Sequence, residues 1–148
     1  IDDFNIMAGY SYNDMRYTKT TGATGSFIEG DRLVRTPQQT ANLSFFYTVP
    51  TGMFKNVSLG AIGNYIGDRV GGWNNRVNPA YPNNVWDREI PVNGYTTIDV
   101  SLGYNWKQFT LLCKLSNITN ELNYTMHENY SVNPIAPRQI LTSLRYKF

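Results

Sequence analysis

Polar and apolar residues alternate one by one along much of this chain. In residues 98–106, Val100 and Leu102 alternate with Asp99 and Ser101. Successive side chains of a strand point to opposite faces, so a period of two predicts strands with one apolar face. Six such runs occur, over residues 4–12, 41–49, 57–66, 98–106, 109–116 and 140–148. No segment shows a helical period of comparable quality, and we expect an all-β, antiparallel fold.

The connections between these runs alternate in length. Residues 18–38, 68–93 and 118–137 are long and polar, whereas residues 50–56 and the few residues around Trp106 are short. Each run is close to the ~9–11 residues with which a tilted strand crosses a bilayer. Short turns on one side and long loops on the other are typical of bacterial outer-membrane barrels. We therefore expect a transmembrane β-barrel segment, multi-pass in the bacterial outer membrane, with short periplasmic turns and long extracellular loops. The alternative is a soluble secreted β-sandwich, which has no reason to segregate its connections by length.

The composition agrees with a membrane barrel. Only 16% of the residues are charged and 14% are aromatic, against roughly 25% charged in soluble domains. Tyr104, Trp106, Tyr146 and Phe148 fall near strand ends, where barrels carry interfacial aromatic girdles. A net charge of +2 gives no reason to expect nucleic acid as a partner. The lone cysteine, Cys113, excludes an internal disulfide framework.

Charge predicts which face of the strands points to lipid. Four charged residues lie on the polar phase of the runs: Asp99, Lys114, Arg145 and Lys147. An arginine or lysine facing lipid at the bilayer midplane costs about 2–4 kcal/mol, so this phase is expected to face the lumen. If Trp106 and Lys107 form a two-residue turn, Lys114 lies directly opposite Asp99. We predict that these two side chains are neighbours.

Six strands cannot make a complete membrane barrel. An open sheet in lipid would leave the amides and carbonyls of its edges without partners, and the smallest single-chain barrels have about eight strands. The chain begins without a methionine or a signal peptide and enters a strand almost at once. We therefore expect residues 1–148 to be the last six strands, the C-terminal portion, of a larger barrel.

Two stretches near the end of the chain carry a family resemblance. LSNITNELNYT (115–125) and APRQILTSLRYKF (136–148) resemble the closing strands of TonB-dependent outer-membrane receptors. In that family, a strand ending in Asn-[Leu/Ile]-[Thr/Asp]-x-x-x-Tyr precedes a last strand that opens with Pro-Arg or Gly-Arg and closes on an aromatic residue. Upstream, GDRLVRTPQQTANLSFFY (30–47) and GNYIGDRVGGWNN (63–75) resemble the siderophore-receptor branch. The resemblance covers essentially the whole chain.

The resemblance implies a 22-stranded barrel plugged by an N-terminal domain. It implies active uptake of a scarce ligand, commonly a ferric siderophore, energised by TonB through the plug. Residues 1–148 contain neither the plug domain nor the coupling segment. Outer-membrane lipids and lipopolysaccharide are further expected partners. Leu144, Tyr146 and Phe148 resemble the closing signal that the barrel assembly machinery reads.

Other transport functions fit the same pattern. The ligand could instead be cobalamin or a glycan, or the barrel could be a passive porin or a structural barrel without energy coupling. No catalytic constellation and no resident cofactor are indicated, and we predict that the protein is not an enzyme. His127 has no nearby cysteine and makes a poor metal site, so no metal site is predicted.

Candidate ligand contacts lie in two of the long connections. Flat aromatic and guanidinium groups combine there, which suits an anionic ferric chelate because arginine pairs with anionic groups in bidentate fashion. The candidates are Arg69, Trp73, Arg76, Tyr81, Trp86 and Arg88, with Tyr124 and Tyr130 in the last connection. Alternatively, these residues pack the loops against their neighbours. In the first connection, Lys19, Arg32 and Arg35 are interpreted as solvated charges or contacts to lipopolysaccharide.

Overall fold

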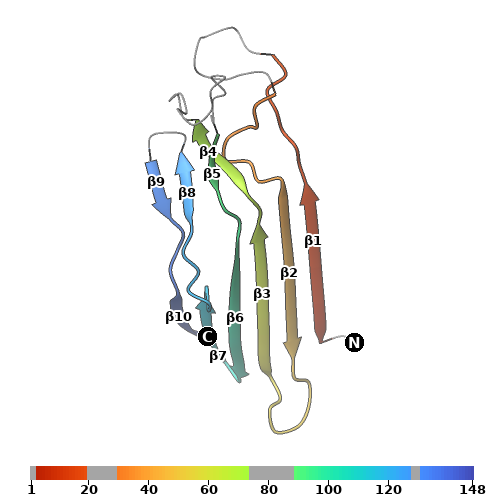
Figure 1. Cartoon of the computed structure of the whole chain (residues 1–148). Coiled ribbons are helices and arrows are strands. Elements are labelled where there is room, and N and C mark those ends of the chain that lie inside the picture. Colours follow the sequence, from red (N-terminus) through yellow and green to blue (C-terminus); the bar gives the residue numbers. More distant parts are fainter. Residues whose placement is uncertain (1–2, 20–29, 74–88, 128–130) are drawn as a thin grey trace.

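A six-stranded antiparallel sheet dominates the structure, a computed structural model that describes residues 3–19, 30–73, 89–127 and 131–148 (Figure 1). The strand order is β1-β2-β3-β6-β7-β10. These strands are β1 (Phe4–Tyr12), β2 (Gln39–Thr48), β3 (Val57–Ile66), β6 (Tyr95–Trp106), β7 (Phe109–Ser116) and β10 (Gln139–Tyr146). They coincide, within a few residues at each end, with the six runs of period two, so the all-β prediction is confirmed.

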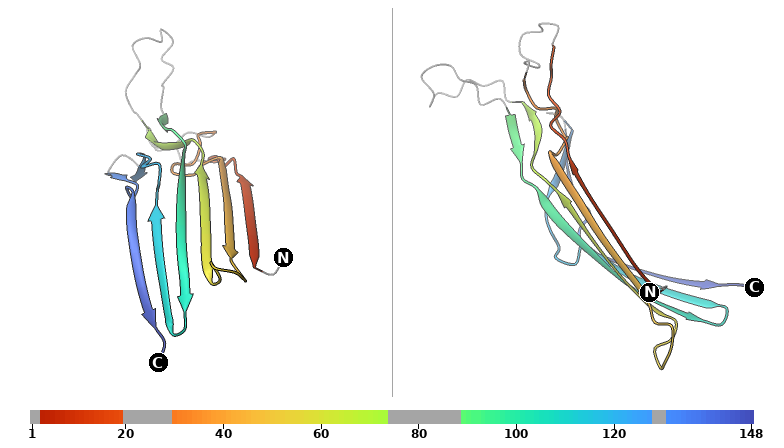
Figure 2. Two further views of the ribbon diagram at one scale, coloured as in Figure 1. Left: turned by 90° about the horizontal axis from the view of Figure 1, so that it is seen from below. Right: turned by 90° about the vertical axis from the view of Figure 1, so that its right-hand side faces the viewer.

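The sheet is a single curved layer, as both views in Figure 2 show. Neither face is covered by a second layer, and Val70 is the one fully buried hydrophobic side chain in the described ranges. β1 and β10 form the two edges, and neither has a further strand paired to it in the described part of the chain. The described residues include no apolar helix of membrane-spanning length.

The register separates the two faces as the alternation predicts. One row across four strands holds Phe45, Ala61, Val100 and Leu115. The adjacent row holds Phe46, Gly60, Ser101 and Lys114, whose side chains point to the opposite face. A slip of one residue would exchange these faces completely, so the apolar pattern specifies the register strongly.

The predicted proximity of Lys114 and Asp99 is confirmed, because Lys114 Nζ lies 2.7 Å from Asp99 Oδ2. Their direct opposition was wrong. Lys114 pairs with Ser101 across the ladder, and the ion pair is diagonal. The turn consists of Lys107 and Gln108 rather than Trp106 and Lys107.

Two properties of this turn account for the difference. Trp106 and Phe109 form the last pair of the β6–β7 ladder, and their rings stack with centroids 6.0 Å apart. Lys107 takes the positive φ of 52° that closes the turn. Ring stacking between the last pair thus extends the ladder by one residue beyond the predicted turn.

The long connections contain short strands that the sequence did not predict. β4 (Arg69–Trp73) pairs with β5 (Glu89–Val92), and β8 (Tyr124–His127) pairs with β9 (Ser131–Pro134). The β4–β5 hairpin continues β3 and β6, and the β8–β9 hairpin extends from β7 and β10 (Figure 1). The prediction that these segments are loops was wrong. Runs of only four or five residues, one of them with an irregularity between Val70 and Gly72, show too little periodicity for a strand to be detected from the sequence.

Candidate functional site

Three connections meet at β4, at the end of the sheet opposite the short turns. The segment before β2 reaches β4 through a 2.7 Å hydrogen bond from the Arg35 N–H to the Val70 carbonyl. On another side, β8 contacts β4. Between them is a small hollow, which we call the outer hollow, lined by Arg35, Arg69, Val70, Gly71, Val92, Thr125 and Met126. It is the place where residues from all three connections surround one space.

Close packing forms the floor of the outer hollow. Val70 is fully buried, and Gly71 is buried beside it. A Cβ at Gly71 would collide with the Met126 sulfur and would lie 2.9 Å from Val92 Cγ2. Glycine at this position therefore allows the β8 hairpin to lie directly on β4.

Arg69, a predicted ligand contact, is buried with 7% of its surface exposed. Its Nη1 donates to the Asn93 carbonyl at 3.2 Å, and its Nη2 donates to Asn123 Oδ1 at 2.9 Å. Nη2 also donates to the Tyr124 carbonyl. The guanidinium carbon lies 5.3 Å from the centroid of the Tyr95 ring. In the structure, the terminal nitrogens of Arg69 thus bind other parts of the chain.

Arg35 differs from Arg69 in both exposure and backbone conformation. Its side chain is exposed, and no other described residue forms a hydrogen bond or ion pair with its guanidinium. Its φ is +65°, in the left-handed region that costs a non-glycine residue about 1–2 kcal/mol. Strained residues cluster at functional sites, although Lys107 adopts a similar φ in an ordinary turn. The sequence assigned Arg35 only a solvated or lipid-contacting charge, because nothing in its neighbours predicts the hollow that it borders.

Other charges nearby are engaged within the protein. Arg16 Nε lies 3.0 Å from Asp14 Oδ1, and Arg16 Nη1 donates to the Gly30 carbonyl at 2.9 Å. The hydrogen bond from Arg16 holds the pKa of the Asp14 carboxyl below its ordinary value. The Arg32 N–H donates to Glu89 Oε1 at 3.2 Å, which connects the first connection to β5. These contacts hold the two ends of the first connection together and join it to β5.

Asn117 organises the turn that follows β7. Its Nδ2 donates to the carbonyls of Glu121 and Ala136, both at 3.0 Å, and its Oδ1 accepts the Glu121 N–H at 2.8 Å. Asn120 accepts the Arg138 N–H at 3.1 Å. Both asparagines have positive φ, which asparagine tolerates better than most residues. The motif that carries the family resemblance is therefore a turn that connects the ends of β7 and β10.

The other predicted ligand contacts are placed as follows. Tyr124 is the first residue of β8 and is exposed. Trp73 is the last residue of β4, where its backbone pairs with Glu89. Five lie outside the described residues: Arg76, Tyr81, Trp86, Arg88 and Tyr130. The described residues contain no group of three or more histidine, cysteine, aspartate or glutamate side chains that could hold a metal ion.

The predicted assembly residues lie at the short-turn end of the sheet. Leu144, Tyr146 and Phe148 are all exposed. Ring centroids are 4.9 Å apart for Phe109 and Tyr146, and also 4.9 Å apart for Tyr146 and Phe148. With Trp106, these rings form an aromatic group at this end, which is the position expected of an interfacial girdle.

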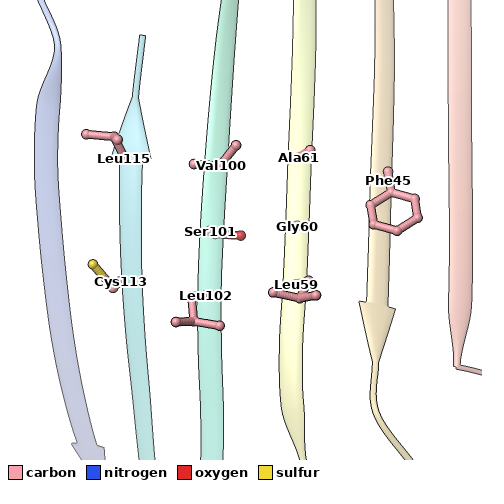
Figure 3. A pocket seen from close by; sticks show the side chains of 9 residues that line it. All are labelled: Phe45, Leu59, Gly60, Ala61, Val100, Ser101, Leu102, Cys113 and Leu115. Atoms are coloured by element: carbon pink, nitrogen blue, oxygen red, sulfur yellow. The ribbon is translucent and has the colours of Figure 1, made fainter. Parts of the chain in front are cut away.

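A shallow apolar depression lies at the middle of the sheet, and Figure 3 shows its lining. Phe45 and Leu115 flank it in the row that also holds Ala61 and Val100. Leu59, Leu102 and Cys113 form the next row on the same face of the sheet. Small side chains such as Ala61 leave the surface low between larger neighbours. The depression offers almost no polar group, so it suits hydrocarbon rather than an anionic ligand.

Comparison with known proteins places this geometry in context. The family model described as "TonB dependent receptor-like, beta-barrel" matches residues 2–118. The curated metal-pseudopaline receptor CntO of Pseudomonas aeruginosa is 24% identical over 149 residues, covering 99% of this chain and 19% of that protein. The chain therefore spans about a fifth of the length of this relative.

Two solved structures show the same fold. Pseudomonas aeruginosa FpvA, solved in complex with a heterologous ferric pyoverdine, superposes with a TM-score of 0.76 at 18% identity, covering 100% of this chain and 18% of FpvA. BauA, the ferric preacinetobactin receptor of Acinetobacter baumannii, gives a TM-score of 0.76 at 22% identity, covering 100% of this chain and 20% of BauA. The family model describes a receptor-like barrel, in agreement with the prediction that the protein is not an enzyme.

Proposed function

Because this chain belongs to the TonB-dependent receptor-like β-barrel family, we propose that it forms part of the barrel wall of an outer-membrane receptor. The observation that carries the proposal is the six-stranded sheet, with one apolar face and two edges to which no further described strand is paired. Edges without partners cannot persist in lipid, so further strands close the barrel. The 22-stranded barrel implied by the resemblance is consistent with this requirement.

The cargo that we propose is a ferric siderophore or a similar metal chelate, imported with energy from TonB through a plug domain outside this chain. The names of CntO, FpvA and BauA support this class of ligand. Among the side chains that the structure describes, Arg35 and Tyr124 are the proposed contacts, because both are exposed where the three connections meet. The remaining proposed contacts are Trp73, Arg76, Tyr81, Trp86, Arg88 and Tyr130.

The proposed orientation follows from the same arrangement. The long connections face the outside, and the short turns face the periplasm. The apolar face contacts outer-membrane lipids, and the charges of the first connection lie where lipopolysaccharide would meet them. Leu144, Tyr146 and Phe148 are exposed, which is what recognition by the barrel assembly machinery requires.

Growth of the source bacterium on single iron sources tests the proposed cargo. Deletion of the gene for the complete receptor is expected to abolish growth on one ferric siderophore and to leave growth on ferrous iron unchanged. The intact gene should restore growth. If the deletion strain grows normally on every ferric chelate but loses uptake of cobalamin or a glycan, the ferric cargo is excluded and the alternative ligand is identified.

A further inference from the structure

Buried Arg69 connects parts of the chain that are far apart in sequence. It belongs to β4, whereas its acceptors are the carbonyl of Asn93 between β5 and β6, the side chain of Asn123, and the carbonyl of Tyr124 at the start of β8. Asn123 Nδ2 also donates to the Asn93 carbonyl, at 3.2 Å. One guanidinium therefore lies at the junction of the β4–β5 and β8–β9 hairpins.

The chemistry of this junction requires an arginine. No described carboxylate forms an ion pair with Arg69, so its buried charge is compensated by three oxygen atoms and by the face of the Tyr95 ring. A planar fork of donors can reach acceptors in several directions at once, which a lysine ammonium on a flexible stem does less well. A buried cation without such partners would be strongly unfavourable.

Asn123 forms hydrogen bonds at the same junction. Its side chain is buried, and its Oδ1 accepts both from Arg69 Nη2 at 2.9 Å and from the Tyr124 N–H at 2.8 Å. Beside this polar contact, Met126 of β8 lies over Gly71 of β4, where no Cβ could be placed. A polar contact and an apolar contact thus hold the start of β8 on β4.

We infer that Arg69 is a positioning residue that fixes the β8–β9 hairpin on the β4–β5 hairpin, so that the outer connections present one preformed ligand surface. Its action on ligand passes through the position of Tyr124 rather than through contact with the cargo. The part of this inference that concerns ligand depends on the proposed function, whereas the mechanical part does not. Preorganisation of this kind raises affinity because less ordering accompanies binding.

Distance measurements by electron spin resonance test the mechanical part without ligand. In the complete receptor carrying Cys113→Ala, spin labels are placed at Val132 of β9 and at Thr96 of β6, both exposed positions. Arg69→Met is expected to widen the distribution of label distances about twofold, because the hairpin loses its polar anchor. Arg69→Lys should give an intermediate width. Arg35→Met is the matched control and should leave the distribution unchanged. Arg35 borders the same hollow, but its guanidinium forms no such bond with another described residue.

Two results would overturn the inference: an unchanged distribution in Arg69→Met, or equal widening in Arg69→Met and Arg35→Met. Heat-modifiable migration in gels verifies that each variant has formed a barrel. If Arg69→Met does not assemble, Asn123→Ala decides, because it keeps the cation and removes one acceptor. Widening in Asn123→Ala supports the anchor, and a distribution like that of the wild type contradicts it.

Binding of a ferric trihydroxamate and a ferric tricatecholate, followed by tryptophan fluorescence, tests the ligand part. A probe that binds the wild type should bind Arg69→Met at least about tenfold more weakly. Equal binding by both proteins would overturn the effect on ligand. If neither probe binds the wild type while the label distances respond as expected, a trihydroxamate or tricatecholate cargo is excluded and the positioning role stands.

Discussion

At the scale of single residues, two glycines of β3 lie in different surroundings. A Cβ on Gly60 would lie 2.5 Å from Ser101 Oγ and 2.9 Å from the Phe46 ring, whereas a Cβ on Gly63 would meet nothing within 4 Å. Gly60 pairs with both Phe46 and Ser101 across the ladder. The phenylalanine ring therefore occupies the space that a side chain at Gly60 would need.

Gly60→Ala is expected to destabilise the complete receptor by about 1–3 kcal/mol, the usual cost of overpacking. Gly63→Ala is the matched control and should be neutral or slightly stabilising, because alanine loses less conformational entropy than glycine in a strand. Urea-induced unfolding in detergent micelles measures both variants. Equal unfolding free energies for the two variants would show that the Phe46 ring moves aside without cost.

Arg35→Gly separates backbone strain from ligand contact. Glycine adopts a positive φ without steric cost but loses more entropy on folding, so the unfolding free energy should stay within about 1 kcal/mol of the wild type. Binding of the proposed ferric siderophore should nevertheless be about tenfold weaker or more, because the exposed guanidinium is lost. Unchanged affinity in titrations of purified receptor would exclude Arg35 as a contact.

At the scale of elements, the turn after β7 depends on one asparagine. Asn117 combines a φ of +49° with side-chain hydrogen bonds to Glu121 and Ala136. Its own N–H donates to Asp99 Oδ1 at 2.9 Å. The turn thus links β6, β7 and the start of β10, although the segments are separated in sequence.

Asn117→Ala should lower the unfolding free energy by about 2–4 kcal/mol, because it removes the side-chain hydrogen bonds and strains the backbone. Asn117→Gly should lower it less than Asn117→Ala does, since glycine relieves the strain while the hydrogen bonds are still lost. Thermal unfolding of the purified receptor ranks the variants. A glycine variant as stable as the wild type would mean that only the backbone conformation matters at this position.

At the scale of the whole molecule, the uncovered sheet has two faces with different chemistry. The row through Val100 and Leu115 is apolar, whereas the row through Ser101 and Lys114 is small or polar except for Phe46 on β2. A closed barrel would direct the first row to lipid and the second to its lumen. The hydrocarbon-lined depression of Figure 3 belongs to the first row and its neighbours.

Spin labels placed one at a time from Val100 to Trp106 of β6 test this assignment in the complete receptor, reconstituted in lipid. Oxygen accessibility should be high at positions 100, 102 and 104 and low at 101, 103 and 105, because oxygen concentrates in the hydrocarbon region. Accessibility to a water-soluble nickel chelate should show the opposite pattern. A flat profile, or one with a period near 3.6, would contradict a β-strand that separates lipid from lumen.

The sequence by itself determined the six principal strands and the face of each. A period of two needs no knowledge of distant residues, because it reflects only the alternation of side chains along a strand. It also placed Lys114 beside Asp99, since a shift of two residues, which pairs Lys114 with Ser101 instead of Asp99, still leaves both charges on one face. Because the alternation of side chains does not change with such a shift, it could not locate the turn exactly. The position of the turn depends on the stacking of Trp106 on Phe109, which is a contact across strands.

Tertiary structure alone decided the arrangement of the outer connections. Arg69, predicted from its residue type as a ligand contact, is buried among acceptors that come from positions 93, 123 and 124. Arg35, predicted as a solvated charge or a contact to lipopolysaccharide, borders the outer hollow formed with β4 and β8. The two arginines thus have different environments, because burial and partners depend on which connections the folded sheet brings together.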